Sequence, residues 1–164
     1  MIIQISVGGV VFRRENNKLY FLLLKTHEVK QDGSVHEWWE FPKGVKEEKE
    51  TDYQTLIREI TEETGLKKLT VLGYCGEITY FFRSEDSHQT VKKTVKYYLV
   101  EAKESDVKIS REHIDFVWAS YEEAMRLLKF KNHKEILKRA YGKIINNDFE
   151  YQTLLTNFLD KSTF

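Results

Sequence analysis

The chain has 164 residues, of which 41% are hydrophobic and 13% aromatic, so it is long enough for one domain with a sizeable core and short for two. Lys and Arg residues number 26, as do Asp and Glu residues, which excludes a globally basic surface that recruits nucleic acid and leaves any attraction for phosphate local. The single cysteine, Cys75, cannot form an internal disulfide. We interpret it as a small buried residue in a reducing, cytoplasmic setting.

The N-terminal part of the sequence predicts a β-hairpin. Residues 4–12 and 18–25 are rich in β-branched and aromatic residues, and the turn between them contains Asn16, a residue type that suits a hairpin turn. Residues 26–37 are interpreted as a polar loop. The N-terminus has no basic leader, and no segment has the roughly 20 apolar residues of a membrane span, so we expect no membrane partner.

A helix follows. Thr51 is suited to cap it, with Gln54 three residues later as the capping-box partner, and Gly65 is suited to end it. Helical spacing also appears in the residues that we expect to face the core, namely Tyr53, Leu56, Ile57 and Ile60.

The rest of the chain predicts strands and then helices. The expected strands are residues 69–83, 90–103 and 114–120, and the expected helices are residues 121–130, 132–145 and 149–161. This order favours an α/β fold in which helices cover both faces of a mixed sheet, with additional C-terminal helices. We assign residues 1–145 to one domain and residues 146–164 to a helical extension that packs on it or on a second subunit. The apolar residues expected to make that packing are Phe149, Leu154, Leu155, Phe158 and Leu159.

Three carboxylates stand close together on the predicted 51–65 helix. Glu59 lies three and four residues before Glu62 and Glu63, so the three share one side of the helix, where each like-charge pair costs about 0.2–0.5 kcal/mol. A solvated helix face is the usual explanation for such charges. A divalent cation is the other, because Mg²⁺ prefers oxygen ligands supplied by carboxylates, water and substrate phosphates.

The full pattern around the helix decides between these explanations. From Gly44, five residues precede Glu50, seven more precede Arg58-Glu59, and Glu62-Glu63 and Gly65-Leu66 follow at fixed spacing. Over these 23 residues the chain resembles the Nudix hydrolases. The resemblance implies an α/β/α sandwich that hydrolyses a nucleoside diphosphate linked to another group, with Mg²⁺ or Mn²⁺ as cofactor.

The resemblance also implies roles for the motif residues. Glu59, Glu62 and Glu63 match the metal ligands, and Glu59 or a neighbour matches the group that takes a proton from the attacking water. Arg58 and Glu50 match a pair that ties the loop to the helix. Gly44 and Gly65 match turn positions. Phosphate anhydride cleavage needs charge neutralisation and an activated water, and metal ions supply both.

Sequences outside the motif resemble the asymmetrical diadenosine tetraphosphate hydrolases between about residues 8 and 140. This branch implies cleavage to ATP and AMP, with Lys43 and Lys93 on the polyphosphate and with Tyr80 and Phe116 stacking an adenine. Glu112 matches a further metal-ligand or base position. Other Nudix activities stay open, namely hydrolysis of nucleoside triphosphates or RNA 5′-polyphosphate ends, and so does a non-catalytic nucleotide-binding module.

Three residues before the motif have two interpretations each. Trp38 and Trp39 are suited to stack a base or to pack in the core, and strand alternation allows only one of them to face a cleft. His36 is suited to contact phosphate, but a loop histidine is more often simply exposed. We include His36 and Trp39 among the candidate substrate contacts.

Overall fold

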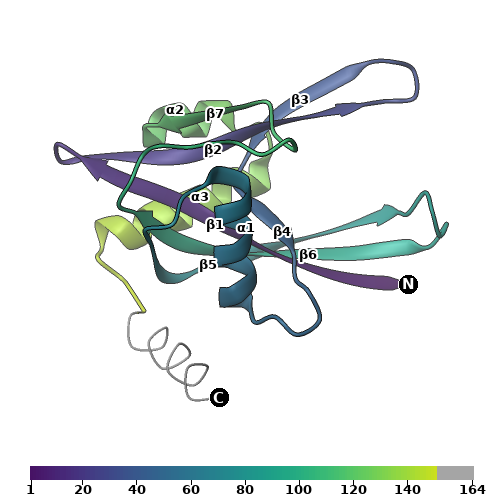
Figure 1. Cartoon of the computed structure of the whole chain (residues 1–164), viewed down its shortest axis with the longest axis horizontal. Coiled ribbons are helices and arrows are strands. Elements are labelled where there is room, and N and C mark those ends of the chain that lie inside the picture. The colour runs from purple at the N-terminus through teal and green to yellow at the C-terminus, as the bar shows by residue number, and fades with distance from the viewer. Residues whose placement is uncertain (151–164) are drawn as a thin grey trace.

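The computed structural model describes residues 1–150, and these residues build one mixed sheet with helices on both faces (Figure 1). The strands are β1 (Ile2–Glu15), β2 (Lys18–Val29), β3 (Val35–Glu40), β4 (Lys43–Val45), β5 (Leu69–Arg83), β6 (Thr90–Ala102) and β7 (Asp115–Ala119). The helices are α1 (Asp52–Thr64), α2 (Tyr121–Leu127) and α3 (Lys131–Ile145). The predicted α/β class, with helices near the C-terminal end, is confirmed.

The sheet runs in the order β3-β2-β1-β6-β5, with β4 beside β1 and β7 beside β2. Strands β1 and β6 are parallel over Ile2–Phe12, whereas the other pairs are antiparallel. β1 pairs with β2 only from Phe12 onward, and over Ser6–Gly8 it pairs with β4 instead. The short strand β4, which was not expected from the sequence, therefore lies beside β1 near the centre of the sheet.

The prediction of a polar loop at residues 26–37 is wrong. β2 continues to Val29 and β3 begins at Val35, so these residues form a hairpin closed by the Lys30 N–H to Ser34 carbonyl hydrogen bond of 2.8 Å. The Asp32 carboxylate accepts hydrogen bonds from the backbone and the hydroxyl of Ser34. Both faces of this hairpin are largely exposed near the turn, so its sequence lacks the apolar alternation by which strands are recognised.

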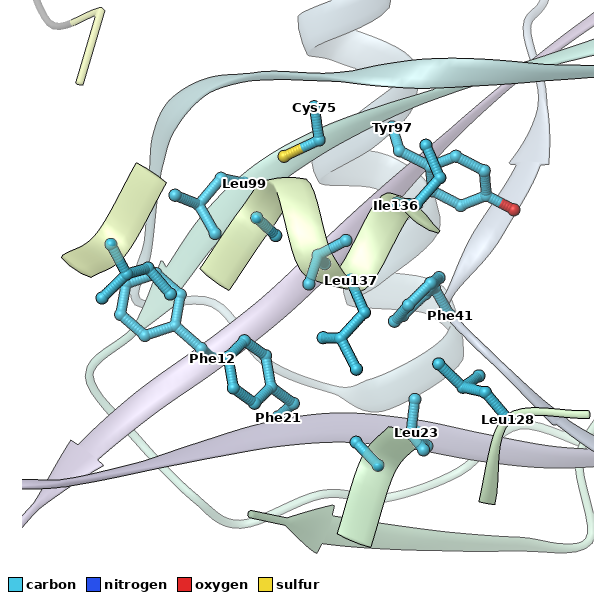
Figure 2. Packing of buried hydrophobic residues seen from close by; sticks show 14 of the residues in the cluster. Phe12, Phe21, Leu23, Phe41, Cys75, Tyr97, Leu99, Leu128, Ile136 and Leu137 are labelled. Carbon is cyan, nitrogen blue, oxygen red and sulfur yellow. The ribbon is translucent and has the colours of Figure 1, made fainter. Parts of the chain in front are cut away.

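Two hydrophobic clusters, one on each face of the sheet, hold the helices in place. We call them the α1-side cluster and the α3-side cluster after the helix that packs on each. Leu56 and Ile60 of α1 pack on one face of the sheet, and α2 and α3 pack on the other. Figure 2 shows Leu137 and Ile136 of α3 within this buried cluster, with Ile136 near Tyr97 of the sheet. Cys75 is buried in the same cluster, as expected. The polar face of α1 is thereby left free for the charged motif.

The remaining sequence expectations concern the turn between β1 and β2 and the C-terminal segment. The turn residues Asn16 and Asn17 both have positive φ, which is the conformation that a tight hairpin turn requires. Phe149 packs against the α3-side cluster, and the Glu150 N–H donates to the carbonyl of Leu72 at 2.8 Å. The helix expected at residues 149–161 falls almost wholly outside the described residues. Among residues 1–150, no helix has the length and apolar character needed to cross a membrane.

Candidate active site

Helix α1 is fixed at both ends by the residues that the sequence indicated. The Thr51 hydroxyl accepts from the backbone N–H of Gln54 at 3.2 Å, and the Gln54 side chain accepts from the Thr51 N–H at 3.0 Å, which completes the capping box. Gly65 ends the helix with φ of 75°. Because Leu56 and Ile60 are buried beneath the helix, the side that carries Glu59 and Glu62 faces away from the core.

The three helix carboxylates differ in burial. The side chain of Glu62 is 58% exposed and that of Glu59 only 13%, whereas Glu63 is almost fully buried. Burial, together with the charge of Glu59, raises the pKa of Glu63 to about 8. Burial also raises the pKa of Glu59, to which the nearby charges of Glu62 and Glu112 add, although Arg58 opposes them. The site therefore gathers negative charge that water does not fully solvate.

Arg58 ties the preceding loop to the helix, the role that the resemblance implied. Its Nε and Nη2 donate to the two oxygens of Glu50 at 2.7 and 2.8 Å, and Nη2 also donates to the carbonyl of Val45 at 3.1 Å. Hydrogen bonding from Arg58 lowers the pKa of Glu50 to about 2. Nη1 of Arg58 reaches Glu59 at 2.7 Å and Glu62 at 3.3 Å.

Gly44 lies directly under Glu59. A Cβ atom at position 44 would overlap the Glu59 carboxylate, so any larger residue there would force this carboxylate out of its position. The preceding residue of the strand is joined to α1 as well, because the backbone N–H of Lys43 donates to Oε2 of Glu63 at 3.2 Å. β4 and α1 thus form a single rigid unit at the site.

The donor chemistry of this unit fits a hard divalent cation. Glu63 is a buried carboxylate whose raised pKa marks a negative charge that its one backbone donor does not offset. In the described part of the chain, no three acidic, histidine or cysteine side chains are already gathered closely enough to chelate an ion. Instead, Glu59 and Glu62 both accept hydrogen bonds from the guanidinium of Arg58. Glu59, Glu62 and Glu63 are the residues that could hold a cation here, and the charge of Glu112 contributes to the raised pKa of Glu59.

A pocket of about 370 Å³ opens beside this unit, between the β3–β4 segment, β5, β6 and the start of α3. Its apolar and aromatic walls are Trp38, Ile78, Tyr80, Val95, Tyr97 and Phe130, and its polar groups are Glu40, Lys43, Asn132 and His133. Lys43 is the link, because its side chain lines the pocket while its backbone holds Glu63.

Two of the predicted substrate contacts line this pocket, and a third is adjacent to it. Lys43 and Tyr80 are in the wall. Lys93 pairs with Tyr80 across the β5–β6 ladder, and burial and the charge of Lys43 lower its pKa. A phosphate chain in the pocket would therefore lie near two lysines.

Three other candidates lie elsewhere. Phe116 packs in the α1-side cluster and is not among the pocket residues. Trp39 packs against the α3-side cluster, with the ammonium of Lys25 over its ring, but it does not line the pocket, whereas Trp38 does. His36 is exposed on β3.

Sequence reasoning missed Phe130, Glu40 and His113. Phe130 enters the pocket because it directly precedes α3, and it packs edge-on against Trp38 with ring centroids 6.3 Å apart. Glu40 and His113 form a buried pair that is discussed below. The one sequence signal for Glu40 was a charged residue within the otherwise apolar run before Pro42.

Comparisons with known proteins agree with this geometry. A family model described as the NUDIX domain matches residues 3–140. The asymmetrical bis(5′-nucleosyl)-tetraphosphatase of Mus musculus is 36% identical over 147 residues, covering 83% of this chain and 92% of the relative. A dihydroneopterin triphosphate diphosphatase of Haemophilus influenzae is 28% identical over 142 residues, covering 82% and 85%. The crystal structure of a C. elegans Ap4A hydrolase binary complex matches with a TM-score of 0.68 and 25% identity, covering 87% of this chain and 98% of that one.

Proposed function

Because the chain belongs to the NUDIX family of hydrolases, we propose that it hydrolyses a nucleoside polyphosphate in a divalent-metal-dependent reaction, with diadenosine tetraphosphate as substrate and ATP and AMP as products. One observation carries the proposal. Lys43 joins the carboxylate-bearing helix to an aromatic pocket large enough for a base. The relatives named as tetraphosphatases direct the choice of substrate within this class.

In this proposal the carboxylates form the reactive end of the site. A divalent cation held by Glu59, Glu62 and Glu63 would neutralise phosphate charge and acidify a water molecule. Glu59, or its neighbour Glu63, accepts the proton of the attacking water, because these carboxylates lie where the cation would hold that water. Arg58 keeps Glu59 oriented through their 2.7 Å hydrogen bond.

The pocket forms the binding end. Tyr80, Phe130 and Trp38 offer aromatic surface on which a purine stacks, and Lys43 lies between them and the helix. Lys93 adds a second positive charge close to Lys43. A nucleotide held by one base at this end presents a fixed phosphate to the helix, so an off-centre cut and unequal products are expected.

A substrate panel tests the proposal. The protein is incubated with Mg²⁺ or Mn²⁺ and diadenosine tetraphosphate, nucleoside triphosphates, ADP-ribose or 5′-triphosphorylated RNA, and the products are separated by chromatography. Release of ATP and AMP from the dinucleotide is expected. Hydrolysis in heavy-oxygen water with mass spectrometry then identifies the attacked phosphorus. Two equal ADP products, or brisk turnover of triphosphates or RNA without cleavage of the dinucleotide, would contradict the substrate assignment.

A further inference from the structure

A buried hydrogen bond between Glu40 and His113 joins two segments that are far apart in the sequence. Nε2 of His113 lies 3.1 Å from Oε1 of Glu40, and the residues are 9% or less exposed. Glu40 ends β3, whereas His113 lies in the loop that precedes β7. Burying two such groups is unfavourable unless each satisfies the other, so the pair fixes the relative position of these segments.

The loop that carries His113 is anchored to the C-terminal end of α1 and to β2. At its start the Ser110 N–H donates to the carbonyl of Glu63 at 3.2 Å, and at its end the Ile114 N–H donates to the carbonyl of Lys25 at 2.9 Å. Glu112 lies between these anchors. The carbonyl of Glu112 accepts a hydrogen bond from the Thr26 hydroxyl at 3.4 Å, and the Ser110 anchor keeps this segment beside Glu63 of α1.

The side chains of His113 and Glu40 have few hydrogen-bond partners besides each other. Nδ1 of His113 is buried without a hydrogen-bond partner among the described residues, so the ring is held through Nε2. The other oxygen of Glu40 accepts from Nε1 of Trp38 at 3.4 Å and lies 3.8 Å from the ammonium of Lys43. Glu40 is thus the point at which the loop, the pocket wall and β4 meet.

We propose that Glu40 and His113 form a positioning pair that holds Glu112 over the carboxylates of α1. The inference rests on the proposed function, because it assigns Glu112 a part in the reaction. Without the Glu40–His113 contact, the segment keeps only the hydrogen bonds to its backbone at Ser110, Glu112 and Ile114, and the side chain of Glu112 shifts relative to α1. A displacement of about 1 Å in a catalytic group is enough to cost on the order of 100-fold in rate.

A double-mutant cycle tests the inference. His113→Phe keeps an aromatic ring but removes the contact to Glu40, and Glu112→Gln removes the positioned carboxylate. We expect His113→Phe to lower kcat by about 10- to 100-fold with little change in KM. In the Glu112→Gln background the same change should lower kcat by less than about 2-fold, since there is no carboxylate left to misplace.

Two further measurements separate positioning from folding. Hydrogen exchange of the Ser110 and Ile114 amides should become faster in His113→Phe while the exchange of α1 is unchanged. If His113→Phe does not fold, the paired variant Glu40→Met with His113→Phe leaves no buried charge unpaired and replaces it in the cycle. Glu40→Gln keeps an oxygen acceptor for His113 and should retain more activity than Glu40→Ala.

The outcomes are distinct. Equal losses from His113→Phe in both backgrounds, or wild-type kcat in either His113→Phe or Glu112→Gln, would overturn the positioning role while wild-type turnover still supports the proposed function. Absence of nucleotide hydrolysis by the wild-type protein would overturn the proposed function and the inference with it.

Discussion

Gly44 and Glu59 are in such close contact that a single added methyl group would occupy the space of the carboxylate. Gly44→Ala should therefore displace Glu59 or β4 and lower turnover by about 100-fold. Gly142→Ala is the matched control, because nothing lies within 4 Å of the added Cβ in α3. Alanine there should stabilise the protein by about 0.5–1 kcal/mol without changing the rate. Steady-state kinetics and urea unfolding of both variants check the prediction, which fails if Gly44→Ala is as active as Gly142→Ala.

Arg58 should not be replaceable by lysine. Its planar guanidinium contacts both oxygens of Glu50 and also Glu59, and a single ammonium group cannot reproduce this geometry. Arg58→Lys is expected to lower kcat/KM by about 10- to 100-fold, as for other residues that orient metal ligands. Arg14→Lys serves as control, because Arg14 makes a single ion pair with Glu101 at 3.3 Å and is half exposed. Similar kinetics for the two variants would count against an orienting role for Arg58.

The pocket predicts which aromatic residue binds the base. Phe130→Ala should raise KM by roughly 5- to 150-fold with a smaller effect on kcat, which corresponds to loss of one stacking contact. Phe116→Ala should instead lower the free energy of unfolding and leave KM unchanged, because Phe116 packs in the α1-side cluster. Kinetics with diadenosine tetraphosphate and urea unfolding distinguish the two. A raised KM for Phe116→Ala together with an unchanged KM for Phe130→Ala would instead support stacking of the adenine between Tyr80 and Phe116, as expected from the sequence.

Asp52 at the start of α1 predicts a pH dependence of stability. Burial raises its pKa, but hydrogen bonds from Lys46 and Tyr98 and the charge of Lys96 lower it overall. A lowered pKa in the folded state stabilises the protein above the unfolded pKa of about 3.9, and the contribution disappears as pH falls through the folded value. Asp52→Asn should therefore destabilise the protein at pH 7, and its difference from the wild-type free energy of unfolding should shrink as the pH falls below the unfolded pKa of about 3.9. A difference between the two that is constant from pH 7 to pH 3 would refute this.

Local chemistry made α1 predictable from the sequence. The capping box at Thr51, the terminating Gly65 and the motif spacing are all short-range signals, and the structure realises each of them. The β2–β3 hairpin was missed because its outer residues are exposed on both faces, so burial does not impose alternation there.

The pocket was harder to predict because it depends on contacts distant in sequence. Strand alternation indicated that one of Trp38 and Trp39 faces a cleft, but only the packing of α3 identifies Trp38. Phe130 and His113 lie 92 and 73 residues from Trp38 and Glu40, respectively, and no local pattern links such positions. Metal binding by the glutamates stays a prediction.

The central claim is that the α1 carboxylates carry a metal-dependent hydrolysis, and Glu62 is the residue with which to test it. Its side chain is 58% exposed, so Glu62→Gln removes charge without disturbing the core. The most direct measurement is the rate of diadenosine tetraphosphate hydrolysis at saturating substrate over a range of Mg²⁺ concentrations. Glu47→Gln is the control, because the carboxylate of Glu47 is also exposed and lies 4.0 Å from the same arginine, Arg58. We predict a rate about 100-fold lower for Glu62→Gln with an unchanged thermal midpoint and a wild-type rate for Glu47→Gln. Equal rates for the wild type and both variants, at limiting and at saturating Mg²⁺, would contradict the claim.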